Sequence, residues 1–177
     1  MRTLKKSLVL VFTLLLGLTL NAQSSDSDVV VTLEFDNAKT AIALLQNYTA
    51  ALQKGDVATM NAQLHEKAMI HGLNGALDSL NVTQHQTYFK QSTDQYTHSI
   101  SSDLYLPVKV ENNWNEGEWI LSWGTNTITD KKTKKQILVP YHTASLVEGG
   151  KIVFIRYYYD ILNVATFQGF TLTPPKK

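Results

Sequence analysis

The residues best placed to do chemistry lie in two strand-like runs near the end of the chain, 136–147 and 152–162. A Gly149-Gly150 turn separates the runs, and alternate positions carry imidazole and phenol groups among large apolar side chains. These positions are His142 in the first run and Ile155, Tyr157 and Tyr159 in the second. A neutral imidazole, with an ordinary pKa of about 6.5, can take up or release a proton near neutral pH. Polar tips on an apolar wall predict a pocket for a mostly apolar organic molecule.

Other chemistries lack the residues that they need. The chain contains no cysteine, which excludes thiol nucleophiles, cysteine zinc sites, disulfides and a lipid-modified cysteine. The five histidines show no metal-binding spacing, and no serine stands in a Gly-x-Ser-x-Gly elbow. The sequence also has no glycine-rich phosphate loop. It therefore predicts neither a metal site nor a bound cofactor.

The first 22 residues have the pattern of a secretory signal peptide. Arg2, Lys5 and Lys6 precede an apolar run over 8–20, and Ala22 supplies a small residue at its exit. The run is shorter than the roughly 20 apolar residues that a membrane-spanning helix needs. We therefore expect a protein exported to the periplasm or the extracellular space, with no membrane segment after the signal is removed.

The remaining part of the chain, residues 23–177, has a length that suits one domain with its own hydrophobic core. The signal segment contains three of the 16 basic residues and none of the 15 acidic ones. Its removal leaves 13 basic residues against 15 acidic ones, a net charge of −2. Because no basic surplus remains to attract a phosphate backbone, nucleic acid is not expected as a partner.

Helical patterns come first in this domain and strand patterns follow. Apolar residues recur at three- and four-residue steps from Ala38 to a helix end at Gly55. Asp56 is expected to cap a second, short helix, and Asn81 a third that runs to about Ser99. Four strand patterns joined by short turns follow, at 104–110, 118–129, 136–147 and 152–162. The order predicts an α+β domain over 38–173, preceded by a polar spacer or arm over 23–37 and followed by a tail over 174–177.

Two segments resemble a known family, and together they bracket nearly the whole domain. Residues 46–75 read QNYTAALQKGDVATMNAQLHEKAMIHGLNG, and residues 149–160 read GGKIVFIRYYYD. Both are similar to the nuclear transport factor 2-like superfamily, in particular to the SnoaL-like polyketide cyclases and the ketosteroid isomerases. The resemblance implies a cone-shaped, curved antiparallel sheet wrapped around three N-terminal helices. It also implies a cavity between the concave face of the sheet and the first helix.

The resemblance further implies which side chains form the cavity wall. Similarity to the isomerases directs alternate residues of the closing strand inward, and the same alternation groups three residues of an earlier strand on one face. The expected ligand-pocket residues are Trp119, Leu121, Trp123, Ile155, Tyr157, Tyr159 and Phe89.

The candidate catalytic residues also come from the resemblance. Tyr48 matches the tyrosine that holds a developing oxyanion in the isomerases, and His142 matches the second acid beside it. The base position falls at or beside His71-Gly72, where no carboxylate stands. The resemblance therefore implies Tyr48, His142 and His71 as catalytic candidates, with a histidine in place of the base.

Three functions remain open at this point. The domain could bind a small, mostly apolar molecule without catalysis, or act as a cofactor-independent cyclase or isomerase that transfers a proton with Tyr48 and a histidine. Superfamily members also pair through the convex face of the sheet, which implies a possible homodimeric interaction module. The row expected on that face is Phe154, Arg156, Tyr158 and Asp160.

Overall fold

The computed structural model describes residues 29–74, 78–171 and 173. The predicted signal peptide, residues 1–22, and the predicted tail, residues 174–177, lie outside the described residues. Within the described ranges, no helix is both long enough and apolar enough to cross a membrane.

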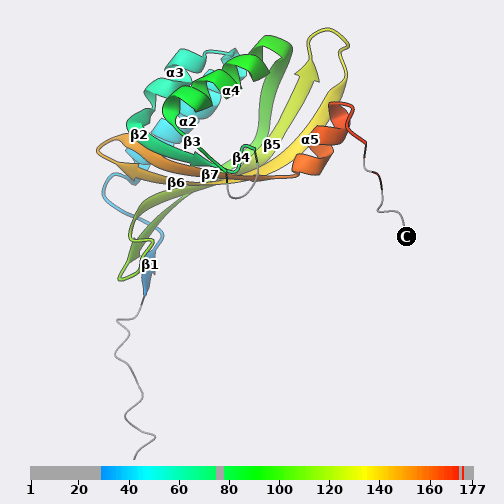
Figure 1. Cartoon of the computed structure of the whole chain (residues 1–177). Helices are drawn as coiled ribbons and strands as arrows, with labels where there is room; N and C mark the ends of the chain where they lie inside the picture. The colour runs from blue at the N-terminus through cyan, green and yellow to red at the C-terminus, as the bar shows by residue number, and fades with distance from the viewer. Residues whose placement is uncertain (1–28, 75–77, 172, 174–177) are drawn as a thin grey trace, which may run out of the picture.

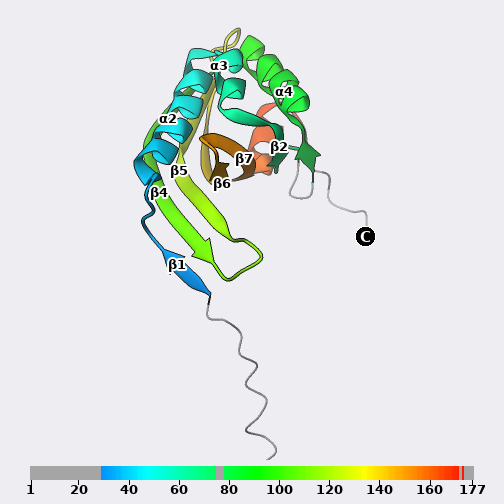
Figure 2. The same ribbon diagram turned by 90° about the vertical axis from the view of Figure 1, so that its left-hand side faces the viewer.

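A curved sheet of seven strands carries helices α2, α3 and α4 on its concave side, and the short helix α5 lies beside the sheet near the C-terminus (Figures 1 and 2). The expected α+β class, with a curved sheet around three N-terminal helices, is confirmed, and the sheet is not closed. In chain order the elements are β1 (Val30–Thr32), α2 (Ala38–Lys54), α3 (Val57–Ala62), β2 (Leu64–His71), β3 (Ser79–Leu80), α4 (Val82–Gln95), β4 (Tyr96–Glu111), β5 (Gly117–Asp130), β6 (Gln136–Glu148), β7 (Lys151–Tyr159) and α5 (Ile161–Phe167).

The strands follow the order β1-β4-β5-β6-β7-β2-β3. Strands β4 to β7 form the expected antiparallel meander, in which each strand pairs with the next one along the chain. Strand β2 extends the sheet by pairing in parallel with β7, and β1 adds a short antiparallel strand beside β4. The predicted arm before the first helix therefore contributes an edge strand to the sheet.

The helices begin and end where local chemistry directs them. Helix α2 ends at Gly55, whose left-handed φ of 70° only glycine adopts freely, and whose N–H bonds the carbonyl of Leu52. The predicted cap of α3 is confirmed, because the Asp56 carboxylate accepts the backbone N–H of Thr59 at 3.0 Å. Asn81 caps α4 in a reciprocal pair with Gln84, and both bonds measure 2.9 Å.

Two element boundaries differ from the prediction. Helix α4 ends at Gln95 rather than near Ser99, because the chain from Tyr96 onward pairs with β5 as strand β4. The closing strand ends at Tyr159 rather than at residue 162. The Asp160 carboxylate there accepts the N–H of Asn163 and starts the unpredicted helix α5.

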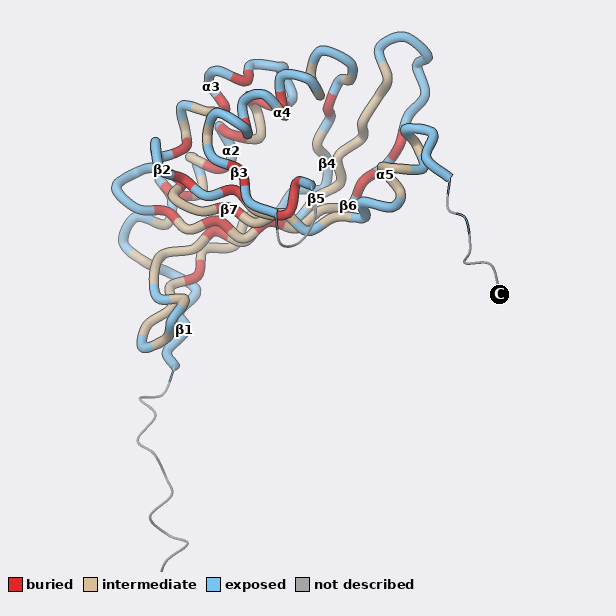
Figure 3. Tube along the Cα trace, viewed as in Figure 1, coloured by how far each residue is buried: buried red, intermediate tan, exposed pale blue. Residues whose placement is uncertain are grey.

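The core lies between the helices and the concave face of the sheet (Figure 3). Tyr48 of α2 and Met60 of α3 are buried there against Ile70 of β2 and Ile120 of β5. Ile155 of β7 is 1% exposed in the same cluster. In the described part of the chain no helix covers the convex face, so its side chains are left at the surface (Figure 1).

Candidate functional site

A cavity of about 140 Å³ lies between helices α2 and α4 and the concave face of the sheet, with α5 at its edge. Its wall consists of apolar side chains and of hydroxyl, amide and imidazole groups. Six of the lining residues are tyrosines. None of the 23 lining residues is Asp, Glu, Lys or Arg. A dry apolar cavity of about this size holds a molecule such as benzene. The space suits a ligand of about one ring, or a longer one whose remainder leaves through the open side.

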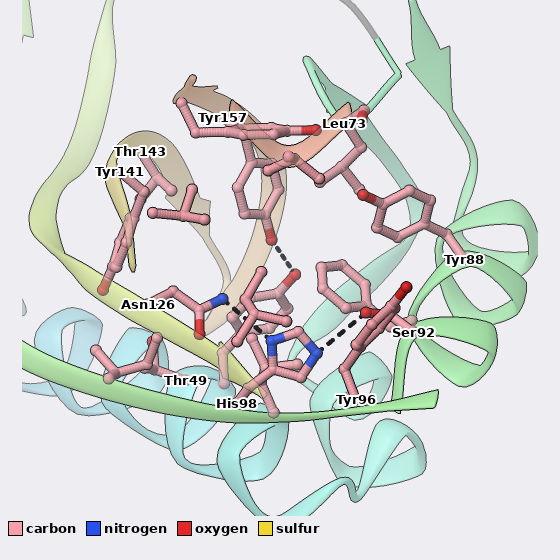
Figure 4. A pocket seen from close by; sticks show the side chains of 18 of the residues that line it. Thr49, Leu73, Tyr88, Ser92, Tyr96, His98, Asn126, Tyr141, Thr143 and Tyr157 are labelled. Atoms are coloured by element: carbon pink, nitrogen blue, oxygen red, sulfur yellow. Dashed lines mark hydrogen bonds between the residues drawn. The ribbon is translucent and has the colours of Figure 1, made fainter. Parts of the chain in front are cut away.

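The inner end of the cavity contains a buried chain of hydrogen bonds from four different elements. The Tyr48 hydroxyl on α2 lies 2.6 Å from Nε2 of His85 on α4. The opposite ring nitrogen of His85, Nδ1, lies 2.6 Å from Oδ1 of Asn61 at the end of α3. The Tyr48 hydroxyl also bonds the hydroxyl of Tyr157 on β7 (Figure 4). These hydrogen bonds therefore run from the cavity wall at Tyr157 to the partly buried amide of Asn61.

Burial sets the protonation of these groups. Desolvation lowers the pKa of His85 to about 4, so its imidazole is neutral at pH 7. Burial raises the pKa of Tyr48, and its hydrogen bond with Tyr157 opposes that rise only in part. Burial also raises the pKa of Tyr157 well above its ordinary value. All three side chains are therefore uncharged near neutral pH.

A second histidine lines the middle of the cavity. His98 of β4 has Nε2 3.0 Å from the Ser92 hydroxyl and Nδ1 3.1 Å from the Asn126 amide nitrogen (Figure 4). Burial lowers the pKa of His98 to about 4, so this ring is also neutral. The three side chains hold one another in place and add polar but uncharged groups to the wall.

Two glycines make room for cavity tyrosines. A Cβ at Gly124 would lie 2.8 Å from the Tyr141 hydroxyl, so glycine lets that ring lie across β5. Gly72 has a φ of +86°, and a Cβ there would lie 2.2 Å from the carbonyl oxygen of Tyr157. Glycine at position 72 therefore lets the loop after β2 approach the strand that carries Tyr157.

Five of the predicted site residues line the cavity. Tyr48 faces it from α2 and Phe89 from α4, and both side chains are buried. The closing strand directs Ile155, Tyr157 and Tyr159 into it, as the resemblance implied. The Tyr159 hydroxyl is held by the carbonyl of Leu73 at 2.6 Å.

The other strand residues of the prediction lie on the opposite, convex face. Ser122 and Thr143 line the cavity as a directly opposed pair, with their hydroxyls 2.6 Å apart. Their sequence neighbours Trp123 and His142 therefore point the other way, with ring centroids 4.7 Å apart. The expected cavity position of His142 is thus wrong, because the strand directs it to the convex face. Its two neighbours in the sequence, Tyr141 and Thr143, occupy the inner face instead. Trp119 and Leu121 share the outward face of Trp123 and do not line the cavity.

His71 also lies away from the cavity. It pairs with Arg156 at the end of β2, and its ring packs against Phe154 with centroids 5.2 Å apart. Among the described residues, nothing hydrogen-bonds its buried Nδ1 atom. The structure therefore brings Tyr48 to the cavity without His71 or His142.

The histidines that do reach the site were not identified as site residues from the sequence. His85 lies on the apolar stripe of its helix, which is the only local signal of an inward side chain. Its partners Asn61 and Tyr48 are 24 and 37 residues away in the chain. In the part of the chain that the structure describes, no three His, Asp or Glu side chains come together as a metal site.

Comparisons with known proteins agree with this geometry at the level of fold. No protein-family sequence model matches the chain, and no curated protein matches it by sequence. A Bacillus subtilis protein provisionally named an isomerase superimposes with a TM-score of 0.63 at 16% identity, over 78% of this chain and 100% of that one. A Xanthomonas campestris pv. campestris protein provisionally named a polyketide cyclase gives a TM-score of 0.60 at 17% identity, over 74% and 98%. An epoxide hydrolase of M. tuberculosis gives 0.56 at 14% identity, over 75% and 98%.

Identities this low carry information about the fold alone. The chain has the nuclear transport factor 2-like fold that the resemblance of its two segments implied.

Proposed function

We propose that this protein binds a small, uncharged, mostly apolar organic molecule in the cavity beside Tyr48. The observation that carries the proposal is the composition of the wall, which has apolar and hydroxyl-bearing side chains but no charged one. An ionised ligand buried there would lose its hydration without gaining a partner of opposite charge, which is costly. A neutral molecule would lose little and would bury its apolar surface.

Native mass spectrometry of the protein purified from its source tests this proposal. We expect a fraction of the protein to carry an added mass that is released on unfolding and belongs to an uncharged compound. A released compound that is ionised at neutral pH would contradict the proposal, and so would protein that is always free of added mass.

We also propose export of the protein, based on the pattern of residues 1–22. The intact mass of the protein from the same source is expected to correspond to a chain that begins at Gln23. A mass that retains residues 1–22 would contradict cleavage of a signal peptide.

A proton-transfer enzyme of the cyclase or isomerase type is the second candidate function. The observation that favours it is the 2.6 Å contact between the Tyr48 hydroxyl and Nε2 of a neutral histidine. That histidine is His85, and it takes the place of the sequence candidates His71 and His142. A base joined to a cavity hydroxyl could move a proton without any cofactor. A Tyr48→Phe variant is expected to lose at least about 100-fold in turnover of the native ligand. Turnover at the wild-type rate would contradict this candidate.

The convex face of the sheet favours pairing with a second copy of the chain. One row of directly opposed residues crosses four strands there, and the rings of Trp123 and Tyr158 pack on either side of His142. Leu104 is 59% exposed and Tyr158 51% exposed in this row. Adjacent exposed apolar side chains of this kind are typical of protein–protein interfaces.

Sedimentation analysis tests the pairing with one variant and a control. The wild type is expected to sediment as a dimer and Trp123→Asp as a monomer, because a buried unpaired carboxylate is costly at an interface. Phe170→Asp places the same charge on a side chain that is 69% exposed outside the sheet and is expected to remain a dimer. A wild type that sediments as a monomer would contradict the homodimer proposal.

A further inference from the structure

The hydrogen-bond chain at the inner end of the cavity has a fixed direction, and the Asn61 amide sets it. The Asn61 nitrogen, Nδ2, donates to the carbonyl of Val82 at 3.2 Å, which orients the amide. Its oxygen, Oδ1, therefore faces Nδ1 of His85 at 2.6 Å. An amide oxygen can only accept, so Nδ1 of His85 must carry a hydrogen.

The direction then passes through His85 to the tyrosines. A neutral imidazole has one N–H, and because that hydrogen is on Nδ1, Nε2 can only accept. The Tyr48 hydroxyl, 2.6 Å away, therefore donates its single hydrogen to Nε2. The Tyr48 oxygen has no further hydrogen to offer, so in its bond with Tyr157 it is Tyr157 that donates.

The last group of the chain faces the cavity without a hydrogen to give. Tyr157 is only partly buried and lines the cavity, with its hydroxyl directed at Tyr48 (Figure 4). Its hydrogen is committed to Tyr48, while a lone pair of its oxygen remains free to accept. A carbonyl oxygen placed there would face the Tyr157 oxygen, and neither of these two acceptors would have a hydrogen to donate. A hydroxyl group of the ligand could donate its hydrogen to the Tyr157 oxygen and so extend the row of hydrogen bonds.

We propose that the inner end of the cavity selects a hydrogen-bond donor, so that the ligand is an alcohol, phenol or enol rather than a ketone or aldehyde. The inference rests on the proposed binding of a neutral ligand in this cavity. It makes Asn61 a positioning residue: the side chain is absent from the cavity wall and acts on the ligand only by fixing the tautomer of His85.

Cyclohexanol and cyclohexanone test this selection, because the two are uncharged and similar in size and differ in whether the oxygen carries a hydrogen. In calorimetric titrations at pH 7, we expect the full-length mature protein to bind the alcohol about tenfold more tightly than the ketone. A ratio of ten corresponds to about 1.4 kcal/mol, which is in the range of one buried hydrogen bond together with the acceptor that a ketone would leave unpaired.

Two variants separate this direction from general polarity. Asn61→Leu removes the acceptor that holds the hydrogen on Nδ1, so the ratio is expected to fall below about twofold. Tyr48→Phe removes the oxygen to which Tyr157 donates, which frees the Tyr157 hydrogen for the oxygen of either compound, so the ratio is again expected to fall below about twofold. Asn47→Leu makes the same change as the first variant at an exposed position of α2 and is expected to keep the wild-type ratio.

Each result has a distinct meaning. Equal binding of both compounds by the wild type, or tighter binding of the ketone, would overturn the donor selection and leave the ligand-binding proposal standing. A tenfold ratio that persists in both Asn61→Leu and Tyr48→Phe would also overturn it, because the chain would then not set the preference. If neither compound bound the wild type, the proposed function would fail as well.

Discussion

Replacing Gly72 by alanine is expected to lower the free energy of unfolding by about 3–5 kcal/mol. The backbone at this position has a φ of +86°, which an alanine adopts only with strain. The added Cβ would also lie 2.2 Å from the carbonyl oxygen of Tyr157, which belongs to the backbone of β7 and cannot move away independently. The strand that carries Tyr157 must therefore shift, and the cavity shifts with it.

Urea unfolding of Gly72→Ala and Gly149→Ala measures this effect against a matched control. Gly149 also has a positive φ, +55°, but within the described ranges no atom beyond the two adjacent residues lies within 4 Å of the position that a Cβ would take there. Alanine at Gly149 is expected to cost only about 1–2 kcal/mol, the backbone part of the penalty. Equal losses in the two variants would show that close packing of Gly72 against β7 has no energetic weight.

Acidification from pH 6.5 to about 4 is expected to destabilise the protein by several kcal/mol. Burial lowers the pKa of both His85 and His98 to about 4, whereas in the unfolded chain each has a pKa near 6.5. Between these values the unfolded chain binds more protons than the folded one, so stability falls as the pH falls. Each histidine contributes up to about 3 kcal/mol to this loss.

Urea unfolding at pH 7.0 and at pH 4.5 checks the size and the source of the loss. The His98→Gln variant is expected to show about half of the wild-type loss, because of the two depressed histidine pKa values only that of His85 then remains. The carboxylates of Asp56 and Asp130 accept hydrogen bonds from Thr59 and Thr133, which lower their pKa, so they titrate below the window. A wild type equally stable at both pH values would contradict the assignment of two buried neutral histidines.

The sequence was sufficient for the starts of α3 and α4, for the buried side of α2 and for the inward side of the closing strand, because their signals are local. Asp56 and Asn81 cap helices through side-chain bonds that span three residues, and the 3.6-residue period places Tyr48 on the buried side of α2. Alternation along β7 correctly separates Tyr157 from Tyr158, because one side of this strand packs against the helices.

The orientation of β6 could not be read from the sequence in the same way. One alternate set of the strand contains His142 with two leucines, an alanine and a proline, and the other contains Tyr141, Thr143 and Ser145 with an isoleucine and two valines. The second set faces inward, and its Ile137, Val139 and Val147 side chains are buried. Because both sets mix apolar and polar side chains, a rule that places apolar residues inside does not choose between them.

The hydrogen bonds that join Asn61, His85, Tyr48 and Tyr157 could not be predicted from the sequence for a different reason. Asn61, His85 and Tyr157 come from three separate elements, and only the folded sheet and helices bring them to Tyr48. Sequence spacing carries no information about contacts between residues so far apart in the chain.

The central claim is that the side chains around Tyr48 enclose open space that takes an uncharged molecule. Methyl chemical shifts recorded by NMR during a titration with toluene test it most directly, because the methyl groups of Leu45, Val139 and Ile155 face the cavity from three different elements. We expect saturable shifts at these three residues and none at Leu138, which is 62% exposed on β6 outside the cavity wall. Unchanged shifts at all three cavity residues would contradict it, because the wall would then enclose no space for a ligand.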